Sequence, residues 1–142
     1  MIHFIVATHG PLATALLESS RMVYGTLPNV RAVTLSEEAG IDGFKADFSR
    51  ALADASDGAD GVLVLCDMQS GTPWNLACQL AFSPRTAPPV AVVAGVNFPM
   101  LLQTDEVGDF SDVNAAARQL IELTHPTLIQ AVLTVFPETD DF

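Results

Sequence analysis

The stretch "IHFIVATHGPLATALLESSRMVYG" (residues 2–25) changes its hydrophobic period at a histidine, and this change points to the fold class. Residues 2–8 are apolar and rich in β-branched side chains, which is typical of a buried strand. After His9, Gly10 and Pro11, apolar residues recur at helical spacing as far as Gly25, so residues 11–24 are predicted to form a helix. The chain therefore begins with a strand that passes into a helix through a short loop carrying His9.

The same alternation continues along the chain. Further strands are predicted at 30–35, 61–67 and 89–95, further helices at about 41–56, 72–82 and 111–123, and a short helix or turn from 97. The run at 61–67 is the most continuous apolar segment and predicts a central strand buried on both faces. Strands alternating with helices predict an α/β fold: a doubly wound, mainly parallel four-stranded sheet with helices on both faces.

The C-terminal segment "TLIQAVLTVF" (127–136) is ambiguous, because its pattern fits either a continued helix or an extra strand at the sheet edge. An apolar edge strand needs a partner. The 142 residues contain no repeat, low-complexity tract or linker, so we expect a single domain over 1–142.

Composition excludes several classes of function. The net charge is −11, with 6 lysine and arginine residues against 17 acidic ones, so binding to nucleic acid or anionic lipid is not expected and a basic protein partner fits better. The two cysteines form no CxxC motif, which argues against a zinc site or a disulfide scaffold. No basic leader precedes the first strand, and no apolar run approaches about 20 residues, so a cytoplasmic protein is expected.

Two loops at predicted strand ends carry chemically useful residues. In a parallel sheet, ligands bind beyond the carboxyl ends of the strands, where helix N-termini direct their amides. His9 lies in the first loop, and "DMQSGTPWN" (67–75) is the second. Each residue also has a purely structural explanation: His9 as a polar loop residue, Asp67 as a cap for neighbouring amides, and Thr72-Pro73 as an N-cap followed by a first-turn proline.

Taken together, the two loops predict a phosphoryl acceptor. If the first and third strands are neighbours, the Asp67 carboxylate can accept a proton from one His9 ring nitrogen, which leaves the other nitrogen as a neutral nucleophile. The amides around Gly71 and Thr72, the Thr72 hydroxyl and the first turn after Gly10 are then available to bind the phosphoryl group. This chemistry needs no metal, nucleotide or other cofactor.

Three motifs carry a family resemblance. The segments "ATHG" (7–10), "CDMQSGTPWN" (66–75) and "VVAGVNFPMLLQ" (92–103), with the spacing between them, resemble the enzyme IIA component of the mannose-family phosphoenolpyruvate-dependent sugar phosphotransferase system, the type serving mannose, fructose, sorbose or N-acetylgalactosamine. The resemblance extends over residues 2–104 and implies a phosphotransferase component. It also implies homodimers that exchange an edge strand, and contact with the membrane only through the IIC and IID subunits.

The resemblance also assigns roles to residues. It implies that His9 Nε2 accepts a phosphoryl group from the phosphocarrier HPr and passes it to enzyme IIB, while Asp67 holds the Nδ1 proton. Gly10, Gly71 and Thr72 correspond to phosphoryl-binding positions. Because the chain ends without a IIB domain, the acceptor is expected to be a separate chain.

Some alternatives remain open. The family usually has glycine where this chain has Ser70, so either the loop differs or the position needs no positive φ. Trp74 fits either packing within its own domain or docking of a partner. The same His9 phosphorylation would also serve a regulatory phosphoprotein without a transport role, or a dihydroxyacetone kinase phosphotransfer subunit. A dinucleotide-binding domain is disfavoured, because no G-x-G-x-x-G follows the first strand.

Overall fold

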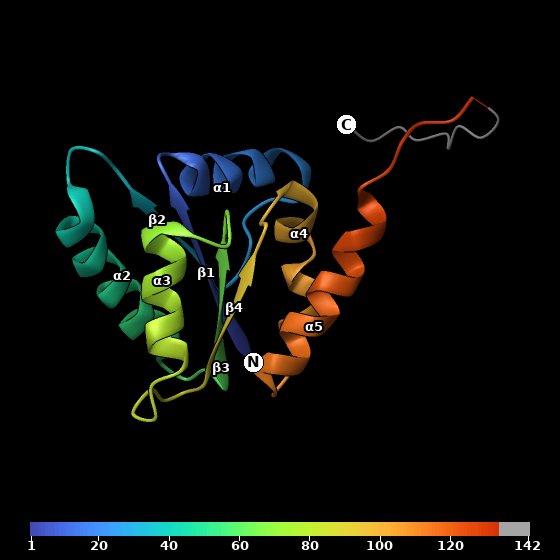
Figure 1. Cartoon of the computed structure of the whole chain (residues 1–142). Helices are drawn as coiled ribbons and strands as arrows, with labels where there is room; N and C mark the ends of the chain where they lie inside the picture. Colours follow the sequence, from blue (N-terminus) through green and yellow to red (C-terminus); the bar gives the residue numbers. More distant parts are fainter. Residues whose placement is uncertain (134–142) are drawn as a thin grey trace.

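The computed structural model describes residues 1–133 and contains one parallel sheet (Figure 1). Its strands are β1 (Ile2–His9), β2 (Val30–Leu35), β3 (Gly61–Cys66) and β4 (Val90–Ala94). The strand order is β2-β1-β3-β4, and every neighbouring pair is parallel. The predicted four-stranded parallel sheet is therefore confirmed.

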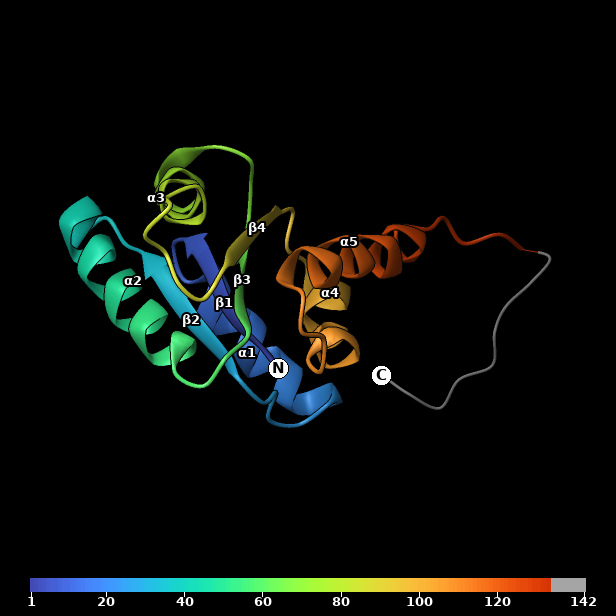
Figure 2. The ribbon, with the colours of Figure 1, turned by 90° about the horizontal axis from the view of Figure 1, so that it is seen from below.

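Helices cover both faces of this sheet. They are α1 (Leu12–Val23), α2 (Gly40–Ser56), α3 (Gly71–Ala81), α4 (Phe98–Leu102) and α5 (Val113–Thr124), with short 3-10 turns η1 (Thr104–Val107) and η2 (His125–Thr127). Figure 2 shows α2 and α3 on one face and α1, α4 and α5 on the other. The doubly wound arrangement predicted from the sequence is confirmed.

The side chains of β1 alternate between the two helical layers. Ile2, Phe4 and Val6 belong to the core beneath α1, α4 and α5, whereas Ile5 and Ala7 belong to the core beneath α2 and α3. This period of two continues to the end of the strand, so the last two residues of β1 face opposite layers. All six residues of β3 are buried, as expected for the central strand.

The topology creates a crevice at one edge of the sheet. The chain passes from β1 outward to β2 and then returns to β3 on the other side of β1. Ligands of doubly wound folds bind where the winding reverses, here beyond the carboxyl ends of β1 and β3. Ala7 is the register partner of Cys66, so His9 and Asp67 emerge beside each other at this edge.

The C-terminal prediction is only partly testable. Residue 127 closes the turn η2, and residues 128–133 form neither helix nor strand, contrary to both expectations for that part of the segment. The sequence pattern there is apolar, but it has no strand beside it in the structure to pair with. Residues 134–136 lie outside the described residues. Within residues 1–133, no helix is long and apolar enough to cross a bilayer.

Candidate functional site

His9 is the last residue of β1, and its side chain is 41% exposed. The strand ends because Gly10 adopts φ +60°, a left-handed conformation that glycine enters without steric cost. The Gly10 amide then donates a hydrogen bond to the carbonyl of Leu35 at the end of β2, at 2.8 Å. The backbone on either side of His9 is thereby fixed to the sheet, while its ring faces the crevice.

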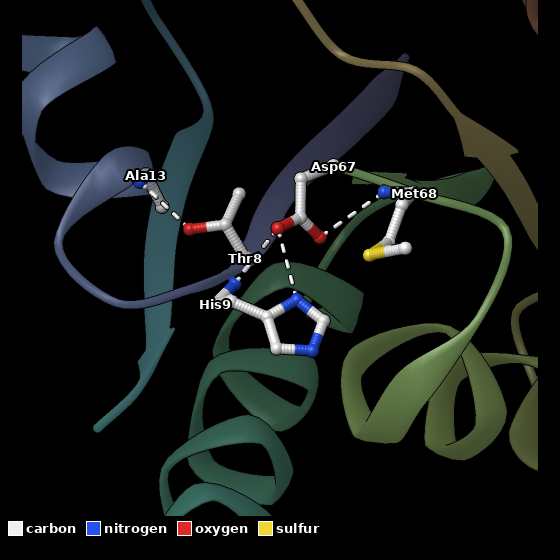
Figure 3. A network of polar contacts seen from close by, with 5 residues as sticks. All are labelled: Thr8, His9, Ala13, Asp67 and Met68. Carbon is white, nitrogen blue, oxygen red and sulfur yellow. Dashed lines mark hydrogen bonds and ion pairs between the residues drawn. The ribbon is translucent and has the colours of Figure 1, made fainter. Parts of the chain in front are cut away.

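Asp67 holds His9 through both its ring and its backbone (Figure 3). Oδ2 of Asp67 lies 2.9 Å from His9 Nδ1 and accepts the His9 backbone N–H at 3.1 Å. Oδ1 accepts the Met68 N–H at 3.1 Å. An ionised carboxylate can only accept hydrogen bonds, so this contact assigns the donated proton to Nδ1, and in a neutral imidazole Nε2 then keeps the free lone pair. The contact expected from the sequence is present.

Gly71 brings the start of α3 against the His9 ring. Its φ is +86°, and a Cβ added to it would lie 2.7 Å from His9 Nε2 and 2.8 Å from Cε1. The residue is therefore glycine for two reasons: its backbone conformation and the close approach of the imidazole. Nε2 consequently lies at the N-terminal end of an 11-residue helix, where amides without intrahelical partners and the helix dipole favour an anion.

The loop before α3 differs in detail from the sequence prediction. The helix begins at Gly71, so the N-cap is Ser70 and not Thr72, and Pro73 occupies the third helical position. Proline is accommodated there because the first amides of a helix have no intrahelical acceptor. Ser70 has φ −170°, an extended conformation open to any residue, so this position does not need glycine. Thr72 is the second residue of α3 and follows Gly71, whose backbone approaches the His9 ring.

The place of Gly10 among the phosphoryl-binding positions stays a prediction, but the structure shows what its backbone does. Its amide already donates to the Leu35 carbonyl, so it is not free for a ligand. A Cβ on Gly10 would meet no atom within 4 Å, so the glycine provides a backbone conformation and not space. Gly10 therefore shapes the turn after His9.

A hollow of about 380 Å³ opens beside His9 on the α2 side. Its walls are formed by His9, Gly10, Leu35, Ser36, Glu37, Gly40 and Ile41. Ile41, the second residue of α2, is 53% exposed and so contributes to this wall and not to the core. The hollow thus has both an apolar residue, Ile41, and an acidic residue, Glu37, in its walls. Neither was identified as a site residue from the sequence.

Thr8 is a further residue that sequence reasoning missed. It is fully buried, and its Oγ1 accepts the Ala13 N–H at 2.8 Å (Figure 3). The only signal in the sequence is a hydroxyl residue near the end of a mostly apolar strand. Trp74, in contrast, packs against the core beneath α2 and α3 and lines a groove beside β4.

The two cysteines are separate from this chemistry. Burial and then the charge of Asp67 raise the pKa of the Cys66 thiol to about 12, so the thiol stays protonated at neutral pH and is a poor nucleophile. Desolvation also raises the pKa of Cys78. Within residues 1–133, no three His, Cys, Asp or Glu side chains are grouped as a metal site would require.

The fold and the position of the site define a class of protein. It is a flavodoxin-like α/β domain with a polar pair at the switch point between β1 and β3. Comparison with known proteins identifies the family: residues 3–121 match the family model described as "PTS system fructose IIA component". The chain belongs to this family of IIA components and is a phosphotransferase component of the sugar phosphotransferase system.

Individual relatives agree with the family assignment. The chain is 35% identical over 103 residues to the fructose-specific EIIA component of Bacillus subtilis (strain 168), covering 72% of this chain and 68% of that protein. It is 25% identical over 143 residues to the sorbose-specific EIIA component of Lacticaseibacillus casei, covering 99% and 100%. The mannose/sorbose-specific IIA subunit from Enterococcus faecalis superimposes with a TM-score of 0.78 at 28% identity, covering 95% of this chain and 98% of that one.

Proposed function

We propose that this IIA component carries its phosphoryl group on Nε2 of His9. The observation that supports this most strongly is the contact of 2.9 Å between Nδ1 and Asp67, which leaves Nε2 as the unprotonated nitrogen beside the start of α3. A ring nitrogen with a free lone pair is a nucleophile at neutral pH without further activation. The site therefore needs to position the reacting groups and stabilise charge.

The proposed reaction is a displacement at phosphorus between two histidines. Nε2 of His9 attacks the phosphoryl group of phospho-HPr, the P–N bond to the donor ring breaks, and the donor nitrogen keeps the bonding electron pair. Because Nδ1 retains its proton, the phosphorylated His9 ring carries a formal positive charge. The Asp67 carboxylate, 2.9 Å from Nδ1, stabilises that charge. Attack by a nucleophile of enzyme IIB reverses these steps and returns His9 to the neutral form.

Groups at the start of α3 would hold the transferred phosphoryl group. The Gly71 and Thr72 amides are among the first amides of α3, which have no intrahelical acceptor, and the Thr72 hydroxyl is a further potential donor. Several amides directed at one anion are the usual way in which doubly wound folds bind phosphate. Gly10 contributes by shaping the turn that presents His9.

The surface around His9 suits a basic partner such as HPr. Exposed apolar side chains stand at the start of α1, at the start of α2 and in the loop after β3: Leu12, Ile41 and Met68, which are 40%, 53% and 50% exposed. Glu37 lines the hollow beside His9, and the whole chain has a net charge of −11. A partner with an apolar patch ringed by lysine and arginine would match this surface and associate faster at low salt.

The proposed function is tested by incubating the protein with phosphoenolpyruvate, enzyme I and HPr. We expect one phosphoryl group per chain that is labile in acid and stable in base, as phosphohistidine is. Adding enzyme IIB should then discharge it. A wild-type protein that never acquires the group would refute the proposal, and a group stable in acid would place it on a residue other than histidine.

We also propose that two copies of the chain associate along β4. Within the described residues, the outer edge of β4 has no partner strand, and a groove of about 260 Å³ beside it is lined by side chains that include Trp74 and Phe82. Residues 128–133 extend away from the domain (Figure 1) and expose Leu128, Ile129, Val132 and Leu133. An unpaired edge and an uncovered apolar segment are complementary between two copies, and burying both removes an aggregation hazard.

This association has a direct test by sedimentation. We expect the wild-type protein to be a dimer at micromolar concentration, and Ile129→Asp to shift it toward monomer because a carboxylate would be buried in the interface. Met22→Asp, on α1 and 70% exposed, is the matched control and should leave the dimer intact. A monomeric wild-type protein would rule out the association.

A further inference from the structure

Thr8 precedes His9 but faces the opposite layer of the molecule. The alternation along β1 places Ile2, Phe4 and Val6 in the core beneath α1, α4 and α5, and Thr8 continues that series. His9 faces the other side, toward α2 and α3, where its ring meets Gly71. Thr8 therefore does not touch the crevice, and any effect on the reaction must pass through the backbone.

The Thr8 hydroxyl caps the start of α1, although Thr8 lies in β1 and not at the N-cap position. The N-cap of α1 is Pro11, which has no side-chain acceptor, and no local side chain caps the helix. Instead, Thr8 Oγ1 accepts the N–H of Ala13, the second helical residue, at 2.8 Å. Thr8 and Ala13 are both 0% exposed, so water cannot replace this bond.

This bond completes a set of three that fix the backbone at His9. The His9 N–H donates to Asp67 Oδ2, and the following N–H, of Gly10, donates to Leu35 O. These two bonds tie His9 to the neighbouring strands, whereas the Thr8–Ala13 bond ties it to α1 across a connection of only two residues, Gly10 and Pro11. A serine or asparagine at the N-cap would satisfy the same helix amide without linking the helix to the strand.

We propose that Thr8 is a positioning residue for the phosphoryl transfer: its hydroxyl fixes the start of α1 against the end of β1, and this sets the orientation of the His9 ring. The inference rests on the proposed role of His9. Ring nitrogen, carboxylate and helix start must align within fractions of an ångström, because small misplacements of reacting groups lower rates steeply. Thr8 contributes to that alignment without contacting the reacting atoms.

The test compares Thr8→Val, which keeps the shape and removes the acceptor, with Thr8→Ser, which keeps the hydroxyl. At saturating phospho-HPr we expect Thr8→Val to transfer about tenfold more slowly with an unchanged KM, and Thr8→Ser to stay within about twofold of wild type. The ¹⁵N resonances of the His9 ring should report a single Nδ1–H tautomer in the wild type and in Thr8→Ser, and a mixture in Thr8→Val.

A second variant separates positioning from simple helix capping. Thr8→Val combined with Pro11→Ser supplies a local N-cap for α1, so it should recover thermal stability while remaining slow and retaining mixed tautomers. Recovery of the rate together with stability would overturn the proposal, because capping alone would then account for Thr8. Thr124→Val, which removes a buried hydroxyl bonded to the Leu120 carbonyl in α5, is the matched control and should change neither rate nor tautomer.

The phosphoryl-transfer assay and the tautomer comparison test the two proposals separately. If the wild-type protein takes no phosphoryl group, the proposed function is wrong, but the tautomer comparison still decides whether Thr8 orients His9. If the wild type is phosphorylated and Thr8→Val matches it in rate and in tautomer, the proposed function stands and the role of Thr8 is refuted.

Discussion

His9→Gln is expected to abolish incorporation of the phosphoryl group completely. Glutamine retains a polar side chain of similar reach, but its amide nitrogen has no available lone pair and cannot attack phosphorus. The ring is 41% exposed and forms no part of either core cluster, so the fold should tolerate the change. The measurement is acid-labile labelling from phosphoenolpyruvate through enzyme I and HPr, with thermal unfolding as a check on folding.

A second histidine gives a matched control for this experiment. His125 is exposed at the end of α5, well outside the crevice between β1 and β3. His125→Gln makes the same chemical change and should label as fast as the wild type. Labelling that survives in His9→Gln would move the acceptor elsewhere, whereas loss of labelling in both variants would mean that the assay responds to general damage.

Asp67→Asn is expected to slow phosphoryl transfer by about a hundredfold, because the side chain must accept hydrogen bonds at both oxygens. Oδ2 accepts from His9 Nδ1–H and from the His9 backbone, and Oδ1 accepts from Met68. Asparagine has one acceptor oxygen. If its amide group faces His9, the ring is driven to the tautomer with the proton on Nε2, which removes the nucleophilic lone pair.

The lost charge adds to the effect of the wrong tautomer. Phosphorylation at Nε2 makes the ring cationic, and a neutral amide stabilises that cation less than a carboxylate does. We therefore expect the ¹⁵N spectrum of Asp67→Asn to contain the Nε2–H tautomer. Asp54→Asn, an exposed change on α2 with the same effect on net charge, should leave the rate unchanged. A wild-type rate in Asp67→Asn would remove Asp67 from the mechanism.

Much of the fold could be predicted because local patterns and long-range packing agree. The change of period at His9 and the continuous apolar run of β3 each reflect how many faces of an element are buried, which is a property of the segment itself. The structure of the C-terminal segment was harder to predict, because a hydrophobic pattern specifies structure only where the segment packs against a neighbour. Residues 128–133 have an apolar pattern but no strand or helix to pack against among residues 1–133, so the pattern alone could not specify their structure.

The site could be predicted only in outline. Chain order placed His9 and Asp67 at strand ends, and the family motifs pointed to Gly71 and Thr72. Hydrogen bonds that backbone amides already make are not visible in the sequence, and the bond from the Gly10 amide to the Leu35 carbonyl is an example. The start of α3 was misplaced because Thr72-Pro73 is a good capping pair locally, whereas the approach of the His9 ring to Gly71 fixes the loop.

The sequence by itself determined the class of fold and placed His9 and Asp67 at strand ends, at the edge of the sheet where we propose that the chemistry takes place. These follow from hydrophobic period and from the rule that parallel strands end at a common edge. Only the tertiary structure decided that β1 and β3 are neighbours in a register that brings Asp67 to Nδ1, and that Gly71 and Thr8 constrain His9 from opposite faces. Such contacts join residues far apart in the chain or on opposite faces of the sheet, and their distances depend on how the layers pack.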